Sequence, residues 1–66
     1  MKLHFDEKAE AIYLRLDDPK IIDAEEVRPG VVLDFNEHNH VVGIEILNLK
    51  DRVPLANLKQ VQFEVV

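Results

Sequence analysis

The residues that could carry chemistry gather in one stretch, VVLDFNEHNHVVGIEIL, which runs from Val31 to Leu47. His38 and His40 stand beside Glu37 near its centre, and imidazole and carboxylate groups are zinc ligands. A structural or catalytic zinc takes three or four protein ligands, and this segment has the composition of an exposed hairpin tip. We therefore expect a polar turn and no cofactor, with these three residues as the only candidate metal ligands.

Two acids, Asp34 and Glu45, interrupt the apolar runs on either side of the turn. The turn sequence NEHN predicts a type I turn followed by a left-handed residue at Asn39, because Asn adopts that conformation at little cost. This turn sets Phe35 opposite Val41, and an uninterrupted ladder then puts the two acids on opposite faces. They could not form a carboxylate pair in that register, although a slip of one residue would reunite them. We expect each acid to face solvent or to pair with a nearby base, with a role at an interface as the alternative.

In the same register, both faces of this hairpin are largely apolar. A short helix and the last strand can cover one face, while the other needs a different cover, for which a second copy of the chain is the simplest candidate. The residues predicted to share that second face form a possible interface: Leu33, Phe35, Val41, Gly43, Glu45 and Leu47.

Alternation of apolar and polar residues dominates the rest of the chain and predicts strands. In AIYLRL, Ile12 and Leu14 share one face and Tyr13 and Arg15 the other. Near the C-terminus the spacing changes and predicts a short helix over Pro54–Lys59. We expect one domain over residues 1–66 of the α+β class, mostly β, in which an antiparallel meander of five or six strands has one short helix near the C-terminus. The predicted strands are residues 3–5, 11–16, 21–27, 31–36, 41–47 and 61–65, with a break at 17–20.

Length and charge limit the kinds of function that are expected. A 66-residue chain buries only about 60% of the surface that it exposes when unfolded. Without cysteine it has no disulfide to compensate, so we expect a homo-oligomer, by default a dimer. The 13 acidic and 8 scattered basic residues argue against nucleic-acid binding and suit a basic protein partner. The N-terminus has no signal-peptide pattern and no apolar run approaches the roughly 20 residues of a membrane span, so a cytoplasmic protein is expected.

The residue inventory also argues against a familiar enzyme class. The chain has no Ser and no Cys, which excludes a serine triad and a cysteine nucleophile. Gly30 and Gly43 are isolated and cannot form a phosphate-binding loop. We expect a non-enzymatic module that binds another protein, antitoxin-like or regulatory. The alternative is a minimal enzyme, or a subunit that binds a small ligand or metal at a site between protomers.

Three segments, FDEKAEAIYLRL, EEVRPGVVLDFN and VVGIEILN, together resemble the small bacterial proteins grouped as domain of unknown function 2283. The resemblance covers Met1 to about Leu49 and departs from the family pattern at Glu7, Glu10 and Asn39. The family pattern usually has Gly where this chain has Asn39, in agreement with a left-handed residue there. The two histidines of the turn are not part of the pattern. The resemblance implies a short bacterial protein and brings no established activity.

Overall fold

The computed structural model describes residues 1–17 and 20–66, and its five strands form one antiparallel sheet. This confirms the predicted fold class, mostly β with five antiparallel strands, while residues 18 and 19 of the predicted break lie outside the described part. The strands are β1 (Lys2–Asp6), β2 (Ala11–Arg15), β3 (Asp23–Arg28), β4 (Val31–Phe35) and β5 (Val41–Ile46).

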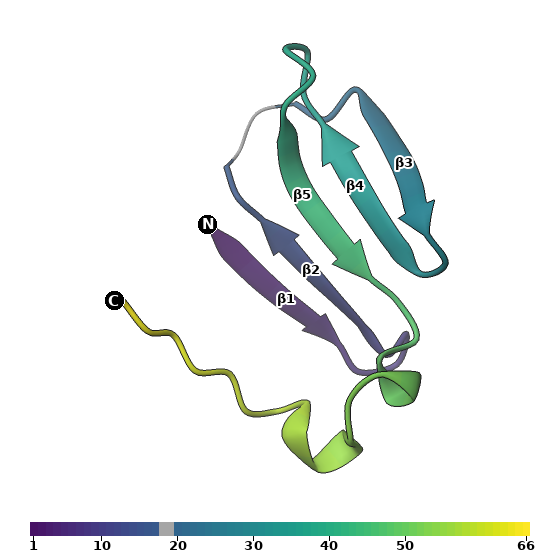
Figure 1. Cartoon of the computed structure of the whole chain (residues 1–66), viewed down its shortest axis with the longest axis vertical. Coiled ribbons are helices and arrows are strands. Elements are labelled where there is room, and N and C mark those ends of the chain that lie inside the picture. Colours follow the sequence, from purple (N-terminus) through teal and green to yellow (C-terminus); the bar gives the residue numbers. More distant parts are fainter. Residues whose placement is uncertain (18–19) are drawn as a thin grey trace.

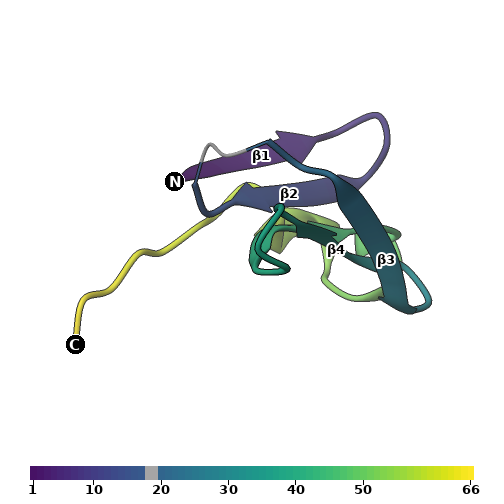
Figure 2. The same cartoon turned by 90° about the horizontal axis from the view of Figure 1, so that it is seen from above.

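The strand order across the sheet is β1-β2-β5-β4-β3 (Figure 1). Strands β3, β4 and β5 follow one another as hairpins, but β2 pairs with β5 and not with β3. Three hairpin-connected strands, with the strand that precedes them in the chain lying beside the last of the three, make a Greek key rather than a simple meander. The sheet is twisted, so that β3 is turned steeply relative to β1 in Figure 2.

The strand registers give the sheet two chemically different faces. The alternation predicted for β2 is confirmed, because Ile12 and Leu14 oppose Ile46 and Ile44 while Tyr13 opposes Glu45. We call the side with the isoleucines the apolar face and the side with Tyr13 the polar face. Extended through the registers of β1, β2, β5 and β4, the apolar face carries Leu3, Phe5, Ile12, Leu14, Leu16, Val31, Leu33, Phe35, Val41, Val42, Ile44 and Ile46. At its β3 edge the same face carries Asp23 and Glu25.

The C-terminal part differs from its prediction. It holds two short 3-10 turns, η1 (Leu49–Asp51) and η2 (Leu55–Asn57), so the helix expected over Pro54–Lys59 is reduced to a single turn. The strand expected over residues 61–65 is an extended segment outside the sheet, and Figure 2 shows its C-terminal end leading away from the sheet. Alternation makes a segment suitable for a strand, but a strand also requires a partner for its backbone.

The core of the described chain is small. Its buried apolar side chains are Val42, Leu49 and Leu58, at 6%, 2% and 6% exposure. Two of them lie in the C-terminal part, near the end of the sheet where β5 leads into η1 (Figure 1). Most of the apolar face is therefore only partly covered. Among the described residues, no helix is long and apolar enough to cross a membrane.

Candidate functional site

The hairpin of β4 and β5 contains the bend that builds the candidate site. Its turn is as predicted: Phe35 opposes Val41, the Asn36 N–H donates to the His40 carbonyl at 3.0 Å, and Asn39 has a φ of 62°. One residue further, the ladder shifts at a β-bulge, so that Asp34 opposes Gly43. The predicted partner of Asp34 was Val42, and the register of every pair beyond Phe35 was therefore wrong by one residue.

This shift places Asp34 and Glu45 on the same face, where the uninterrupted ladder had separated them. Asp34 opposes Gly43, and Glu45 lies two residues further along the same strand. Such diagonal neighbours are within reach of side chains of this length. The expectation that each acid faces solvent or pairs with a base was wrong for Asp34, which is 4% exposed and has Glu45 as a carboxyl neighbour.

Gly43 makes room for the carboxylate of Asp34 and the ring of Tyr13. A Cβ atom on Gly43 would lie 2.8 Å from Asp34 Oδ2 and 2.9 Å from the Tyr13 hydroxyl oxygen. Both contacts are shorter than real Cβ atoms make, so the two side chains occupy the space above the glycine. An isolated Gly in a strand is a known sign of a bulge or of close approach, and this was the signal in the sequence for the shifted register.

Tyr13 connects the acids to two further polar residues. The Arg15 guanidinium donates from Nη1 to the Tyr13 hydroxyl at 3.2 Å. On the neighbouring strand, His4 opposes Tyr13, and the two ring centroids are 6.3 Å apart. A shallow hollow of about 290 Å³ lies beside this row on the polar face, with Tyr13 and Glu45 in its wall.

The surroundings of Glu45 favour its protonated form. Partial burial raises the pKa of the Glu45 carboxyl above its ordinary value of 4.5, and the negative charge of Asp34 and a hydrogen bond with Asp34 raise it further. A hydrogen bond between two carboxyl groups requires that one of them carry a proton. Chemically, the pair can hold one shared proton or accept N–H donors.

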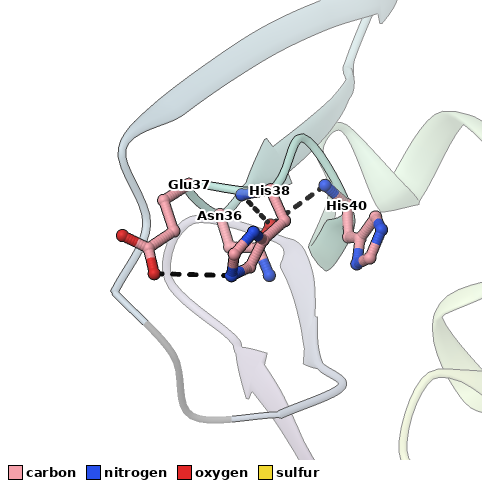
Figure 3. A network of polar contacts seen from close by, with 4 residues as sticks. All are labelled: Asn36, Glu37, His38 and His40. Carbon is pink, nitrogen blue, oxygen red and sulfur yellow. Dashed lines mark hydrogen bonds and ion pairs between the residues drawn. The ribbon is translucent and has the colours of Figure 1, made fainter.

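The histidines lie apart from this cluster, at the exposed tip of the hairpin (Figure 3). The Asn36 side-chain oxygen accepts the backbone N–H groups of His38 and His40, each at 3.0 Å. His38 Nε2 lies 3.5 Å from Glu37 Oε1, and the two imidazole rings are 6.2 Å apart. The side chain of Asn36 therefore accounts for the shape of the turn. Within residues 1–17 and 20–66, no group of three or more His, Asp or Glu residues is placed to hold a metal ion.

The six residues predicted as one interface are divided by the bulge. Leu33, Phe35 and Val41 belong to the apolar side of the hairpin, whereas Gly43 and Glu45 lie on the polar face. Leu47 follows the alternation of Glu45 and lies in the wall of the same hollow. Only the first three can therefore belong to one surface with the apolar side chains of β1 and β2.

Comparison with known proteins bears on these observations. The family model described as "Protein of unknown function (DUF2283)" matches residues 2–50, which include all five strands and the carboxyl pair. The chain belongs to the DUF2283 family. No curated protein and no solved structure matches this DUF2283 chain. The two-faced sheet and its polar cluster lie within the family-matched part, and the C-terminal segment lies beyond it.

Proposed function

We propose that this DUF2283 protein acts by binding another protein molecule through the apolar face of its sheet, without catalysis. The observation that carries this proposal is the exposure of large apolar side chains along β1 and β2. Leu3 is 48% exposed and Leu16 37%, and both lie on that face. Contiguous apolar surface of this kind marks interaction sites in proteins of this size.

The polar face supports a non-catalytic role. Asp34 and Glu45 are neighbours on this face, and the Tyr13 hydroxyl accepts a hydrogen bond from Arg15. Among the described residues no buried side-chain nitrogen or oxygen lacks a hydrogen-bond partner, and the chain has no Ser or Cys to act as a nucleophile. The polar face is thus accounted for by its internal contacts, whereas the described part of the chain covers the apolar face only partly.

The acidic charge at the β3 edge of the sheet favours a basic partner. Edge strand β3 presents Asp23, Glu25 and Glu26, all exposed, and the chain carries a net charge of −5. An acidic edge attracts basic proteins, so a basic partner and an antitoxin-like or regulatory role are part of this proposal. The location that we propose is the cytoplasm, in keeping with the absence of cysteine.

The test is cross-linking in the native host with two matched variants. Leu3→Lys places a charge on the apolar face, while Ile22→Lys does so at a side chain that is 59% exposed and lies beside β3 at the hairpin-tip end. We expect Ile22→Lys to keep the cross-linked products of the wild type and Leu3→Lys to lose them. A wild-type chain that forms no cross-linked product, or products that survive Leu3→Lys unchanged, would contradict the proposal.

A second candidate function, binding of a small ligand or metal, is favoured by the hollow beside Tyr13 and Glu45. It predicts that a divalent cation such as Mg²⁺ or Zn²⁺, or a small amine, raises the midpoint of thermal unfolding. Glu45→Gln should abolish that effect if the polar face is the site, and His38→Ala with His40→Ala should abolish it if the hairpin tip is. If none of these probes shifts the midpoint of thermal unfolding, the second candidate function is excluded and only protein binding remains.

A further inference from the structure

We propose that the molecule bound by the apolar face is a second copy of this chain. It docks where the start of β1 lies beside the end of β2. The inference rests on the proposed function and adds the identity of the partner. The surface, which we name the β1–β2 patch, is a hollow of about 610 Å³ lined by Met1, Leu3, Leu14 and Phe63. Leu16 continues the same face beyond Leu14.

The exposed area of the chain fits this size of interface. Its accessible surface is 5436 Å². A compact monomer of 7.6 kDa exposes about 4300 Å² by the usual scaling, roughly 1100 Å² less. Part of the difference comes from the extended C-terminal segment, which itself lines the β1–β2 patch. A specific protein interface buries about 800 Å² on each partner, so docking one further molecule there would remove most of the excess.

The small core explains why the partner should be a second copy. Among the described residues, three apolar side chains are buried, and a single core of this kind gives a 66-residue chain little stability. The chain has no disulfide, and its candidate metal ligands do not come together in the described part. A fold that needs another molecule to cover its apolar face requires a partner that is present whenever the chain is made. Another copy of the chain meets this condition by definition.

The distribution of charge on the apolar face also favours self-association at this end. The side chains that line the β1–β2 patch are all uncharged. The acids Asp23 and Glu25 oppose Phe35 and Leu33, at the far edge of the same face. Interfaces of homodimers are more apolar than transient ones, and a two-fold interface brings one patch against its own copy. Docking through the patch keeps both acids in water.

The C-terminal segment completes the patch. Its residues Val61, Phe63 and Val65 alternate with polar ones and are 66%, 84% and 86% exposed. The last backbone bond before them is donated by the Gln60 N–H to the Asn57 carbonyl. Phe63 borders the same hollow as Leu3 and Leu14, and its side chain remains largely exposed on a single sheet. Two apolar faces packed about 10 Å apart would enclose it on both sides.

The test is sedimentation velocity of the purified full chain over a range of concentrations, with two matched pairs of variants. Leu3→Thr changes the patch and keeps a residue suited to a strand, and Ile22→Thr is its control away from the patch. Phe63→Ser changes the patch from outside the sheet, so the sheet can still fold, and Val66→Ser is its control in the same segment, at 117% exposure. Circular dichroism verifies that each variant is folded.

We expect the wild type to sediment as a dimer at micromolar concentrations. Leu3→Thr and Phe63→Ser should each raise the dissociation constant at least about tenfold, as expected for anchors of an interface. Ile22→Thr and Val66→Ser should leave it within about twofold. Added salt should not weaken the dimer, because the side chains of the patch are uncharged and screening reduces the repulsion between two acidic chains.

A wild type that stays monomeric over the whole range overturns the second copy as partner. The cross-linking experiment then decides the proposed function separately, because a Leu3-dependent product with a different protein would preserve that function. A dimer that Ile22→Thr disrupts and Leu3→Thr does not would overturn both. A monomer whose Phe63 simply packs on its own Leu3 also contradicts the inference, and it is recognised by unchanged sedimentation of Phe63→Ser.

Discussion

Asp34 of β4 lies directly opposite Gly43 of β5, and its Oδ2 atom occupies the space that a side chain at position 43 would fill. The pairing depends on the β-bulge between Phe35 and Asp34. Because side chains alternate along a strand, the same shift brings Glu45 onto the face of Asp34. One irregularity in the ladder thus creates the carboxyl pair and leaves the other face of the β4–β5 hairpin apolar.

Gly43→Ala should destabilise the fold by about 1–3 kcal/mol, the usual cost of overpacking. The added Cβ would meet Asp34 Oδ2 at 2.8 Å and the Tyr13 hydroxyl at 2.9 Å, and the buried Asp34 has little room to move. Urea unfolding measures the loss. Tyr13→Phe removes one of the two contacts, so the double variant should lose less than the sum of the two single changes. Gly43→Ala with wild-type stability would show that Asp34 does not pair with Gly43.

Glu45→Gln should stabilise the protein near neutral pH by about 0.2–1 kcal/mol, because it removes one of two like charges on neighbouring strands. The pKa of Glu45 is raised in the folded state, so the folded protein binds the proton more tightly than the unfolded chain. The stability from this proton is complete below the ordinary pKa of 4.5 and is lost as the pH rises through the raised value.

The free energies of unfolding of Glu45→Gln and wild type should therefore agree at low pH and diverge upward from about pH 4.5, with the variant more stable. Ionisable groups that do not interact with Glu45 cancel in this difference. Glu37→Gln at the exposed hairpin tip is the matched control and should show no such divergence. A difference that shrinks as the pH rises would have the wrong sign for a raised pKa at Glu45.

Arg52→Ala should cost about 1 kcal/mol, since the guanidinium joins the C-terminal turn to two loops of the sheet. Its Nη2 donates to the Pro29 carbonyl at 2.7 Å and its Nε to the Leu47 carbonyl at 3.2 Å. Arg52→Lys should recover only part of this, because an ammonium lacks the planar fork. Arg28, which bonds the carbonyl of its neighbour Val27, is the control, and Arg28→Ala should cost less than about 0.5 kcal/mol. Equal costs at the two arginines would refute this role.

Asn36→Ala should cost about 1–2 kcal/mol, whereas His38→Ala should stay within about 0.5 kcal/mol. The Asn36 side chain accepts two backbone N–H groups of the turn, and the His38 side chain is exposed and contacts Glu37 at 3.5 Å. Thermal unfolding of the two variants side by side measures the contrast. A larger loss for His38→Ala would mean that the histidines, and not the amide, hold the hairpin tip.

The alternation of residues such as Ile12 and Tyr13 was enough to predict the strands and the faces of β2, because a strand in contact with a core on one side must alternate. The turn at Asn36–Asn39 was also predictable, since few residues adopt the left-handed conformation that Asn39 has. The bulge one residue later was not, because Val41 and Val42 are both apolar and either suits the ladder. Gly43 was the remaining sign of it.

The pairing of strands that are distant in the sequence could not be predicted, for a different reason. That β2 pairs with β5 depends on which strand edges meet in space, and local alternation does not record this. The C-terminal segment shows the opposite case: Val61, Phe63 and Val65 alternate as a strand does, yet they pair with no strand of the described chain, although β1 lies at the sheet edge. Burial of Asp34 was missed because it follows from the bulge.

The most direct test of the central claim, that another molecule of this chain covers the apolar face, is the concentration dependence of thermal unfolding. A folded dimer that dissociates as it unfolds must show a higher midpoint at higher concentration. We expect the midpoint to rise by several degrees between about 2 and 200 μM protein for the wild type and for Ile22→Thr, and to rise much less for Phe63→Ser. A midpoint that is the same at both concentrations for the wild type would contradict the claim.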